Sequence, residues 1–199
     1  MLNVKQEYHH WTDEALMQEV AQQNKRAFDI IYTRYSRLMF SFFYRMLWKD
    51  KELANDLCQE IFTKVVLHAS QFDRSRPFKT WLYSIANNMC KNEYAKHSVR
   101  SQATMKIETA TENTATSQLD LAHFKARLHQ LIQNLDEVKK QTIELRFFQE
   151  LSVPEIAATM ACSEGTVKSR LFYILKEFQN ELKAYKEILT LFILIAPWI

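Results

Sequence analysis

Four side chains near the C-terminal end of the sequence carry the kind of donors that a protein uses to read duplex DNA. Thr166, Lys168, Ser169 and Arg170 offer hydroxyl, amine and guanidinium groups in one short stretch. The major groove admits a helix, and the N-terminal residues of that helix then face the base edges. If these residues begin a helix, they can contact a DNA sequence directly.

A second candidate segment, residues 74–100, carries six basic residues against a single acidic one. Apolar residues three and four positions apart predict a helix with one core stripe, which leaves a polar face that we expect to be exposed. That face comprises Tyr83, Ser84, Asn87, Asn88, Lys91 and Asn92. Amides can satisfy the edge of an unpaired base, an aromatic ring can stack on it and lysines can follow phosphates, a combination that suits single-stranded DNA. A solvated basic face is the alternative.

A third group, Asp56, Gln59 and Glu60, places two carboxylates four positions apart, on one face of a predicted helix. Paired carboxylates can act as acid and base, but a protein-docking patch explains them equally well. The sequence has no glycine-rich phosphate loop, no HExxH motif and no zinc-type cysteine pairing. We therefore expect no enzyme activity, no metal and no cofactor.

The donors at 166–170 stand within a helix-turn-helix pattern. Ser152 and Glu155 have the spacing of a capping box, which marks the start of a short helix. A break at residues 161–165 follows, and a second helix then continues from Thr166. Val167 and Leu171, four positions apart, would hold that second helix against the first. A helical hairpin with an ordinary polar face remains the alternative.

The composition predicts an all-α fold. With 47% hydrophobic residues, one glycine and three prolines, the chain can build packed cores but has few residues for tight strand turns. Four helices are expected between about residues 13 and 97, with Asp13 and Asp50 as N-caps. Residues 98–120 are mostly small and polar, as in a flexible linker. Helical periodicity returns over residues 121–185, so we expect two small helical domains.

These segments together resemble the sigma-70 family of RNA polymerase sigma factors, in the short layout of its extracytoplasmic-function (ECF) group. The resemblance covers nearly the whole chain. It rests on AFDIIYTRY, DLCQEIFTKV, FKTWLYSIANNMCKNEY and LRFFQELSVPEIAATMACSEGTVKSRLF, which occur in the family's order. It implies that residues 1–97 form region 2, residues 98–120 a linker and residues 121–185 region 4.

The resemblance also implies roles for particular residues. Asp56, Gln59 and Glu60 match the part of region 2 that docks on the β′ clamp helices of core RNA polymerase, and the β flap is a further expected contact. Tyr83, Asn87, Asn88, Lys91 and Asn92 match the part that holds the melted −10 element, with Asn88 at the position that engages a flipped base. The expected −35 residues are Arg146, Thr166, Lys168, Ser169, Arg170, Phe172 and Tyr173.

Some features fall outside this pattern. Tyr173 stands where some members of the family carry a basic residue, so the promoter sequence cannot be transferred. Residues 186–199 form an apolar C-terminal tail, shorter than the roughly 20 residues that a membrane-spanning helix needs. Since the first residues do not resemble a secretion signal, we expect a cytoplasmic protein. An anti-sigma factor is a further partner that the resemblance allows.

Two other functions remain open at this point. A helix-turn-helix transcription regulator with an N-terminal sensing or dimerisation domain would share the C-terminal motif, but it would need an oligomer and palindromic sites. An RNA-binding or adaptor protein would use the polar face around Asn88 and would not depend on Lys168 or Arg170.

Overall fold

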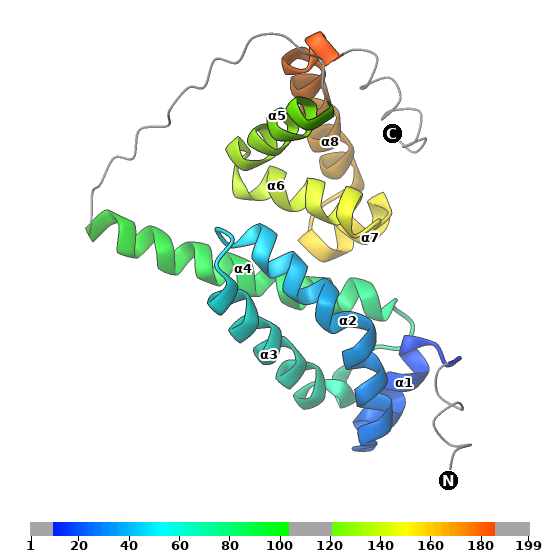
Figure 1. Ribbon diagram of the computed structural model, residues 1–199. Helices are drawn as coiled ribbons and strands as arrows, with labels where there is room; N and C mark the ends of the chain where they lie inside the picture. Colours follow the sequence, from blue (N-terminus) through cyan, green and yellow to red (C-terminus); the bar gives the residue numbers. More distant parts are fainter. Residues whose placement is uncertain (1–9, 104–120, 186–199) are drawn as a thin grey trace.

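The computed structural model describes residues 10–103 and 121–185, and within these ranges every regular element is helical (Figure 1). The all-α prediction is therefore confirmed. The N-terminal domain contains α1 (Asp13–Ala21), α2 (Lys25–Met46), α3 (Lys51–Leu67), the 3₁₀ turn η1 (Ala69–Gln71) and α4 (Phe78–Ala103). The C-terminal domain contains α5 (Leu121–Asn134), α6 (Glu137–Ile143), the π-helical turn η2 (Glu144–Phe148), α7 (Val153–Met160), α8 (Glu164–Glu181) and the 3₁₀ turn η3 (Lys183–Tyr185).

Polar side chains begin the first three helices. The Asp50 carboxylate accepts hydrogen bonds from the backbone N–H groups of Glu52 and Leu53, so the predicted N-cap of α3 is confirmed. The predicted cap Asp13 is wrong by one residue, because the Thr12 hydroxyl caps α1. Asp13 is instead free to accept a hydrogen bond from Arg34 of α2 at 2.5 Å. This contact fixes α1 against α2.

The aromatic residues of α2 form the centre of the N-terminal core. Phe42 and Phe43 are fully buried, and their rings meet edge to face with centroids 5.6 Å apart. Phe78, the first residue of α4, is also fully buried and packs edge to face on Tyr35, at 5.2 Å. Such buried rings remove large apolar areas from water and add favourable edge-to-face geometry. The helix that carries the predicted −10 face is therefore anchored firmly at its N-terminal end.

Helix α4 is longer than the sequence predicted. The linker was expected to begin at residue 98, but the helix continues through Ala103. Once a helix is nucleated, each further residue adds a hydrogen bond without a new nucleation step, so a polar stretch can extend it at little cost. The remaining linker residues, 104–120, and the apolar tail, 186–199, lie outside the described residues.

The C-terminal domain contains the predicted helix-turn-helix. Ser152 and Glu155 form the capping box, in which each side chain bonds the backbone N–H of the other residue. Helix α7 ends at Met160, and its C-cap residue Ala161 has a left-handed backbone with φ of 52°. The Ser163 hydroxyl then accepts the N–H of Thr166 and starts α8. The turn is thus fixed by local hydrogen bonds on both sides.

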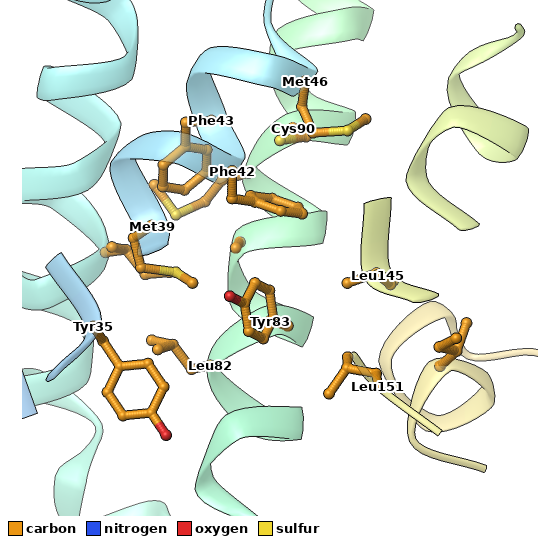
Figure 2. Close-up of a cluster of buried hydrophobic side chains, with 14 of the residues drawn as sticks. Tyr35, Met39, Phe42, Phe43, Met46, Leu82, Tyr83, Cys90, Leu145 and Leu151 are labelled. Atoms are coloured by element: carbon orange, nitrogen blue, oxygen red, sulfur yellow. The ribbon is translucent and has the colours of Figure 1, made fainter. Parts of the chain in front are cut away.

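The two domains lie against each other (Figure 1). Helix α7 packs along α4, and α6 contacts α2. Figure 2 shows the buried Tyr83 of α4 between side chains of α2 and two leucines of the C-terminal domain, Leu145 and Leu151. The sequence analysis predicted two domains joined by a linker but did not predict this packing.

We expect Ser152→Ala to lower the free energy of unfolding by about 1 kcal/mol, because an N-cap hydroxyl and its partner N–H lose their hydrogen bond. Urea unfolding followed by circular dichroism measures this change. The matched control is Ser70→Ala in η1, where the serine is exposed and caps no α-helix. Equal midpoints for the two variants would contradict the capping role.

Candidate nucleic-acid interface

The predicted single-strand face of α4 divides into an exposed and a buried part. Asn88, Lys91 and Asn92 are exposed, as expected. Tyr83 and Asn87 are both 0% exposed, so the expectation that the whole face is open to solvent is wrong for these two residues. For Tyr83 the physical reason is the C-terminal domain, because α7 packs against α4 and Gln149 bonds the Tyr83 hydroxyl.

Tyr83 connects the two domains directly. Its hydroxyl donates a hydrogen bond to the side-chain oxygen of Gln149, and its ring meets Phe42 edge to face at 5.4 Å. Burial raises the pKa of Tyr83, and the nearby Glu144 carboxylate raises that pKa further. The phenol therefore stays protonated at physiological pH and acts as a donor.

Two further contacts surround Gln149. The Lys79 amine donates to the Gln149 backbone oxygen at 2.6 Å, and the Gln149 amide nitrogen donates to Glu144 at 2.8 Å. Glu144 in turn accepts two hydrogen bonds from the Arg45 guanidinium, at 2.6 and 2.8 Å. We call these five residues, Arg45, Lys79, Tyr83, Glu144 and Gln149, the interdomain latch.

Asn87, one helical turn after Tyr83 on α4, is fully buried and its side chain has no hydrogen-bond partner within the described structure. This holds for both the side-chain oxygen and the side-chain nitrogen. A buried polar group left unpaired destabilises the state that buries it, by about 1–3 kcal/mol. Asn87 therefore does not favour the packed arrangement of the domains, although its amide could pair with a base if α4 were uncovered.

The predicted duplex-reading residues of α8 lie at the surface. Lys168 and Ser169 are exposed, Thr166 and Arg170 are half-buried, and the side chains of Phe172 and Tyr173 are 59% and 63% exposed. The Arg170 guanidinium donates to the Cys162 sulfur at 3.7 Å, which holds it near the turn. The rings of Phe172 and Tyr173 meet edge to face with centroids 5.4 Å apart and form an exposed apolar surface on α8.

Arg146 stands apart from this surface. It is half-buried in η2, and its guanidinium donates to the Leu151 backbone oxygen at 3.0 Å. This bond ties η2 to the loop before α7. The structure thus places Arg146 next to the first helix of the helix-turn-helix rather than on α8.

The predicted polymerase-docking residues lie on α3. Asp56, Gln59 and Glu60 are all exposed, and Glu60 forms an ion pair with Lys64 at 3.1 Å, one turn further on. The pair lies at the surface, where such contacts contribute little to stability. The carboxylates are therefore available to a partner.

The sequence analysis did not identify four of the latch residues, Arg45, Lys79, Glu144 and Gln149. It did contain one signal that this side of α4 is buried, because Tyr83, Asn87, Cys90 and Tyr94 recur at spacings of four, three and four. Such spacing describes a second buried stripe. Cys90 is indeed fully buried, and burial raises the pKa of its thiol. Tyr94 donates to the Met46 backbone oxygen at 2.8 Å.

The described residues contain no cluster of histidine, cysteine and carboxylate side chains that could hold a metal ion. None of the helices formed by residues 10–103 and 121–185 has both the length and the apolar character needed to cross a membrane.

We expect Asn87→Leu to raise the free energy of unfolding by about 1–3 kcal/mol, because it replaces an unpaired buried amide by an apolar group of similar size. Thermal and urea unfolding of the full chain measure the change. The control is Asn92→Leu, an exposed position on the same helix, which should leave stability nearly unchanged. A destabilised Asn87→Leu variant would mean that the amide does have a partner.

Comparison with known proteins places this geometry in a family. The family model for sigma-70 region 2 matches residues 31–100, and that for sigma-70 region 4 matches residues 125–177. The RNA polymerase sigma-H factor of Pseudomonas aeruginosa is 31% identical over 174 residues, which cover 80% of this chain and 88% of that protein. The ECF RNA polymerase sigma-E factor of Haemophilus influenzae is 29% identical over 183 residues, or 86% of this chain and 96% of the relative.

Solved structures agree on the fold. The structure of CnrH in complex with the cytosolic domain of CnrY matches with a TM-score of 0.64 and 22% identity, over 86% of this chain and 97% of that one. The sigma factor RpoE, solved with the anti-sigma factor NepR from Bartonella quintana, matches with a TM-score of 0.62 and 23% identity, over 78% and 96% of the chains. The chain thus belongs to the sigma-70 family, in its ECF group, and is a sigma factor that directs transcription initiation.

Proposed function

We propose that three separate surfaces of this sigma factor divide the work of initiation between polymerase docking, −35 recognition and −10 recognition. The observation that carries this proposal is the exposure of polar residues on three different helices, α3, α4 and α8. Within this division residues 1–97 act as region 2, residues 121–185 as region 4 and residues 98–120 as the connection, with α4 extending region 2 to Ala103.

The −35 element is read as duplex DNA by α8. Thr166, Lys168, Ser169 and Arg170 lie in its first two turns, where a recognition helix faces base edges and phosphates. The exposed rings of Phe172 and Tyr173 follow on the same helix and supply apolar contacts, such as those made with thymine methyl groups. Arg146, from η2, contributes a positive charge near the DNA backbone.

The −10 element is held as a single strand by α4. Asn88 takes an unpaired base, while Lys91 and Asn92 follow the strand along the exposed side of the helix. Tyr83 and Asn87 lie on the adjoining side and would extend this surface by stacking and hydrogen bonding once they are uncovered. The amides and the ring suit unstacked bases rather than a closed duplex.

Core RNA polymerase is the partner that joins the two DNA contacts. We assign Asp56, Gln59 and Glu60 to the β′ clamp helices, and the C-terminal domain to the β flap. Each DNA surface offers few phosphate contacts, so each alone binds weakly, whereas linking them raises the effective concentration of the second site. The protein acts by binding rather than by catalysis, in the cytoplasm where polymerase works.

An anti-sigma factor is a further proposed partner. Among solved structures that share this fold, the sigma factor RpoE is bound to the anti-sigma factor NepR, and CnrH is bound to the cytosolic domain of CnrY. A comparable partner for this chain would cover the surfaces on α3, α4 and α8 that the DNA and the polymerase need.

Run-off transcription with purified core polymerase tests the promoter roles. The full chain should direct initiation from a defined set of genomic fragments, and Asn88→Ala and Arg170→Ala should each reduce transcript by about five- to a hundredfold, as expected for lost base contacts worth about 1–3 kcal/mol. Glu177→Gln, an exposed change on α8 without a proposed contact, is the control. Binding of duplex DNA by a dimer, without polymerase, would instead support an ordinary helix-turn-helix regulator.

Polymerase affinity tests the α3 surface independently of DNA. We expect the double variant Asp56→Asn and Glu60→Gln to bind core polymerase at least about tenfold more weakly, and more so at low salt, because an electrostatic docking contact is screened by ions. Fluorescence anisotropy with labelled protein gives the affinity. Glu177→Gln again serves as the control, and unchanged binding of the double variant would remove these residues from the docking surface.

A further inference from the structure

The chain contains a single glycine, Gly165, and this residue is the second of helix α8. Glycine lowers the stability of a helix more than any residue except proline, because its backbone loses the most conformational freedom on folding. Three reasons can place a glycine there: an unusual backbone conformation, a close contact inside the protein, or a close contact with a partner.

Backbone conformation does not require a glycine at this position. A left-handed backbone, with positive φ, is the conformation that favours glycine. Gly165 does not have a positive φ. Among the described residues, the positions that do have one are occupied by Gln23, Trp48, Lys49, Glu150 and Ala161. The chain therefore has other residues where a glycine would be least strained, and its glycine where the backbone is helical.

Packing inside the protein does not require a glycine either. A Cβ atom at Gly165 would lie 3.7 Å from the Ser163 hydroxyl oxygen, which is an ordinary van der Waals distance. It would meet no other atom within 4 Å outside its chain neighbours and the backbone of its own helix. Gly165 is also exposed. A methyl group would therefore fit without any shift of the surrounding residues, so a contact with a partner is the reason that remains.

Gly165 lies on the face of α8 to which −35 recognition is assigned. In a helix, residues three, four and seven positions apart share one face. Lys168, Ser169 and Phe172 stand at these distances from Gly165, and all four residues are exposed. Val167, by contrast, is fully buried and marks the opposite face. Gly165 thus stands at the leading end of this face, where a recognition helix meets the base edges.

Two short side chains at this end of α8 also need the helix to come close to its partner. The Ser169 hydroxyl donates to the Thr166 backbone oxygen at 3.0 Å, and the Thr166 hydroxyl lies 2.9 Å from that of Ser163. Both hydroxyls are held against the helix, although each oxygen can still accept a hydrogen bond. Since such a bond needs a separation of about 3 Å, they reach a base only if the backbone of α8 approaches the groove closely.

We propose that Gly165 is a specificity-determining residue of the −35 contact, because its missing side chain lets the first turn of α8 approach the duplex. The inference rests on the −35 role proposed above for α8, and it adds the residue that sets how far the helix enters the major groove. The groove is only just wide enough to admit a helix. A methyl group on the leading face would hold the hydroxyls of Thr166 and Ser169 away from the base edges.

Promoter binding by the holoenzyme tests this proposal. Core polymerase is combined with the full chain, and its affinity is measured for a promoter found by run-off transcription and for the same fragment with a scrambled −35 region. Gly165→Ala should lower the affinity for the intact promoter by about five- to a hundredfold, as expected when a methyl group is forced into a filled contact. Gly165→Val should lower it further.

The scrambled fragment shows whether the effect concerns sequence reading. Its affinity should stay within about twofold in both variants, because binding that does not read sequence depends on phosphate charge, which alanine and valine leave unchanged. The preference of the holoenzyme for the intact −35 region should therefore shrink as the side chain at position 165 grows.

Thermal unfolding separates this role from a structural one. Because alanine is a better helix former than glycine, Gly165→Ala should raise the Tm by about 1–4 °C while it weakens promoter binding. The matched control is Asn180→Ala, at an exposed position of the same helix. This variant should also raise the Tm, since asparagine is a weaker helix former than alanine, but it should leave promoter binding unchanged.

Two results would overturn the proposal. One is a folded Gly165→Ala protein whose holoenzyme binds the intact promoter as tightly as the unchanged chain does. The other is a Gly165→Ala protein with a lowered Tm, which would mean that the fold itself needs the glycine.

Arg170→Ala distinguishes failure of this inference from failure of the proposed function. If Arg170→Ala loses promoter binding and Gly165→Ala keeps it, the −35 role of α8 stands and only the role of Gly165 falls. If neither Arg170→Ala nor scrambling of the −35 region changes binding, the −35 role of α8 is removed, and the role of Gly165 falls with it.

Discussion

The charge of Glu144 is the constraint on which the arrangement of the molecule depends. A carboxylate that is almost completely buried must be paired, and the nearest guanidinium comes from the other domain, on α2. Within the C-terminal domain, Glu144 accepts a hydrogen bond from the neutral amide of Gln149 and interacts with the positive charge of Lys140. Arg45 adds a bidentate partner from the other domain. A buried ion pair of this kind contributes little net stability, but the loss of one partner is costly because it leaves the other charge buried and unpaired.

The π-helical turn η2 explains why Glu144 and Gln149 both reach the N-terminal domain. A π turn inserts an extra residue into a helix and alters which side chains share a face, and such turns are frequent at functional sites. Here the turn spans Glu144–Phe148 and ends with Gln149, whose N–H bonds the Glu144 backbone oxygen at 3.1 Å. Glu150 then takes a left-handed backbone with φ of 55°, and the chain turns towards α7. The latch thus depends on a local irregularity rather than on a regular helix face.

Local sequence patterns predicted the helices well, because N-caps and apolar stripes are determined by residues that lie within a few positions of one another. The Ser152–Glu155 capping box and the Asp50 cap follow from hydroxyl and carboxylate chemistry alone. The exposure of Tyr83 was predicted wrongly because its burial involves Gln149, 66 positions away, which accepts a hydrogen bond from the Tyr83 hydroxyl. Asn87, one turn further along α4, is also fully buried. The spacing of Tyr83, Asn87, Cys90 and Tyr94 marks a second buried stripe on α4, but it does not show which part of the chain covers that stripe. The π turn also escaped prediction, since a regular helical pattern runs through it.

The predicted single-strand face of α4 contacts the C-terminal domain in this structure and a DNA strand in the proposed function. The hydrogen-bonding groups that these two partners offer are similar. The C-terminal domain offers Tyr83 an amide oxygen and offers Lys79 a carbonyl oxygen, both of which a nucleic acid can also supply through base and phosphate oxygens. Asn87 receives nothing from the C-terminal domain, but an unpaired base presents both a donor and an acceptor. On the −10 role proposed for α4, a DNA strand in place of this protein surface would preserve the contacts of Tyr83 and Lys79 and would satisfy Asn87. The hydrogen-bonding groups of this face therefore suit the single strand that the proposed function assigns to it.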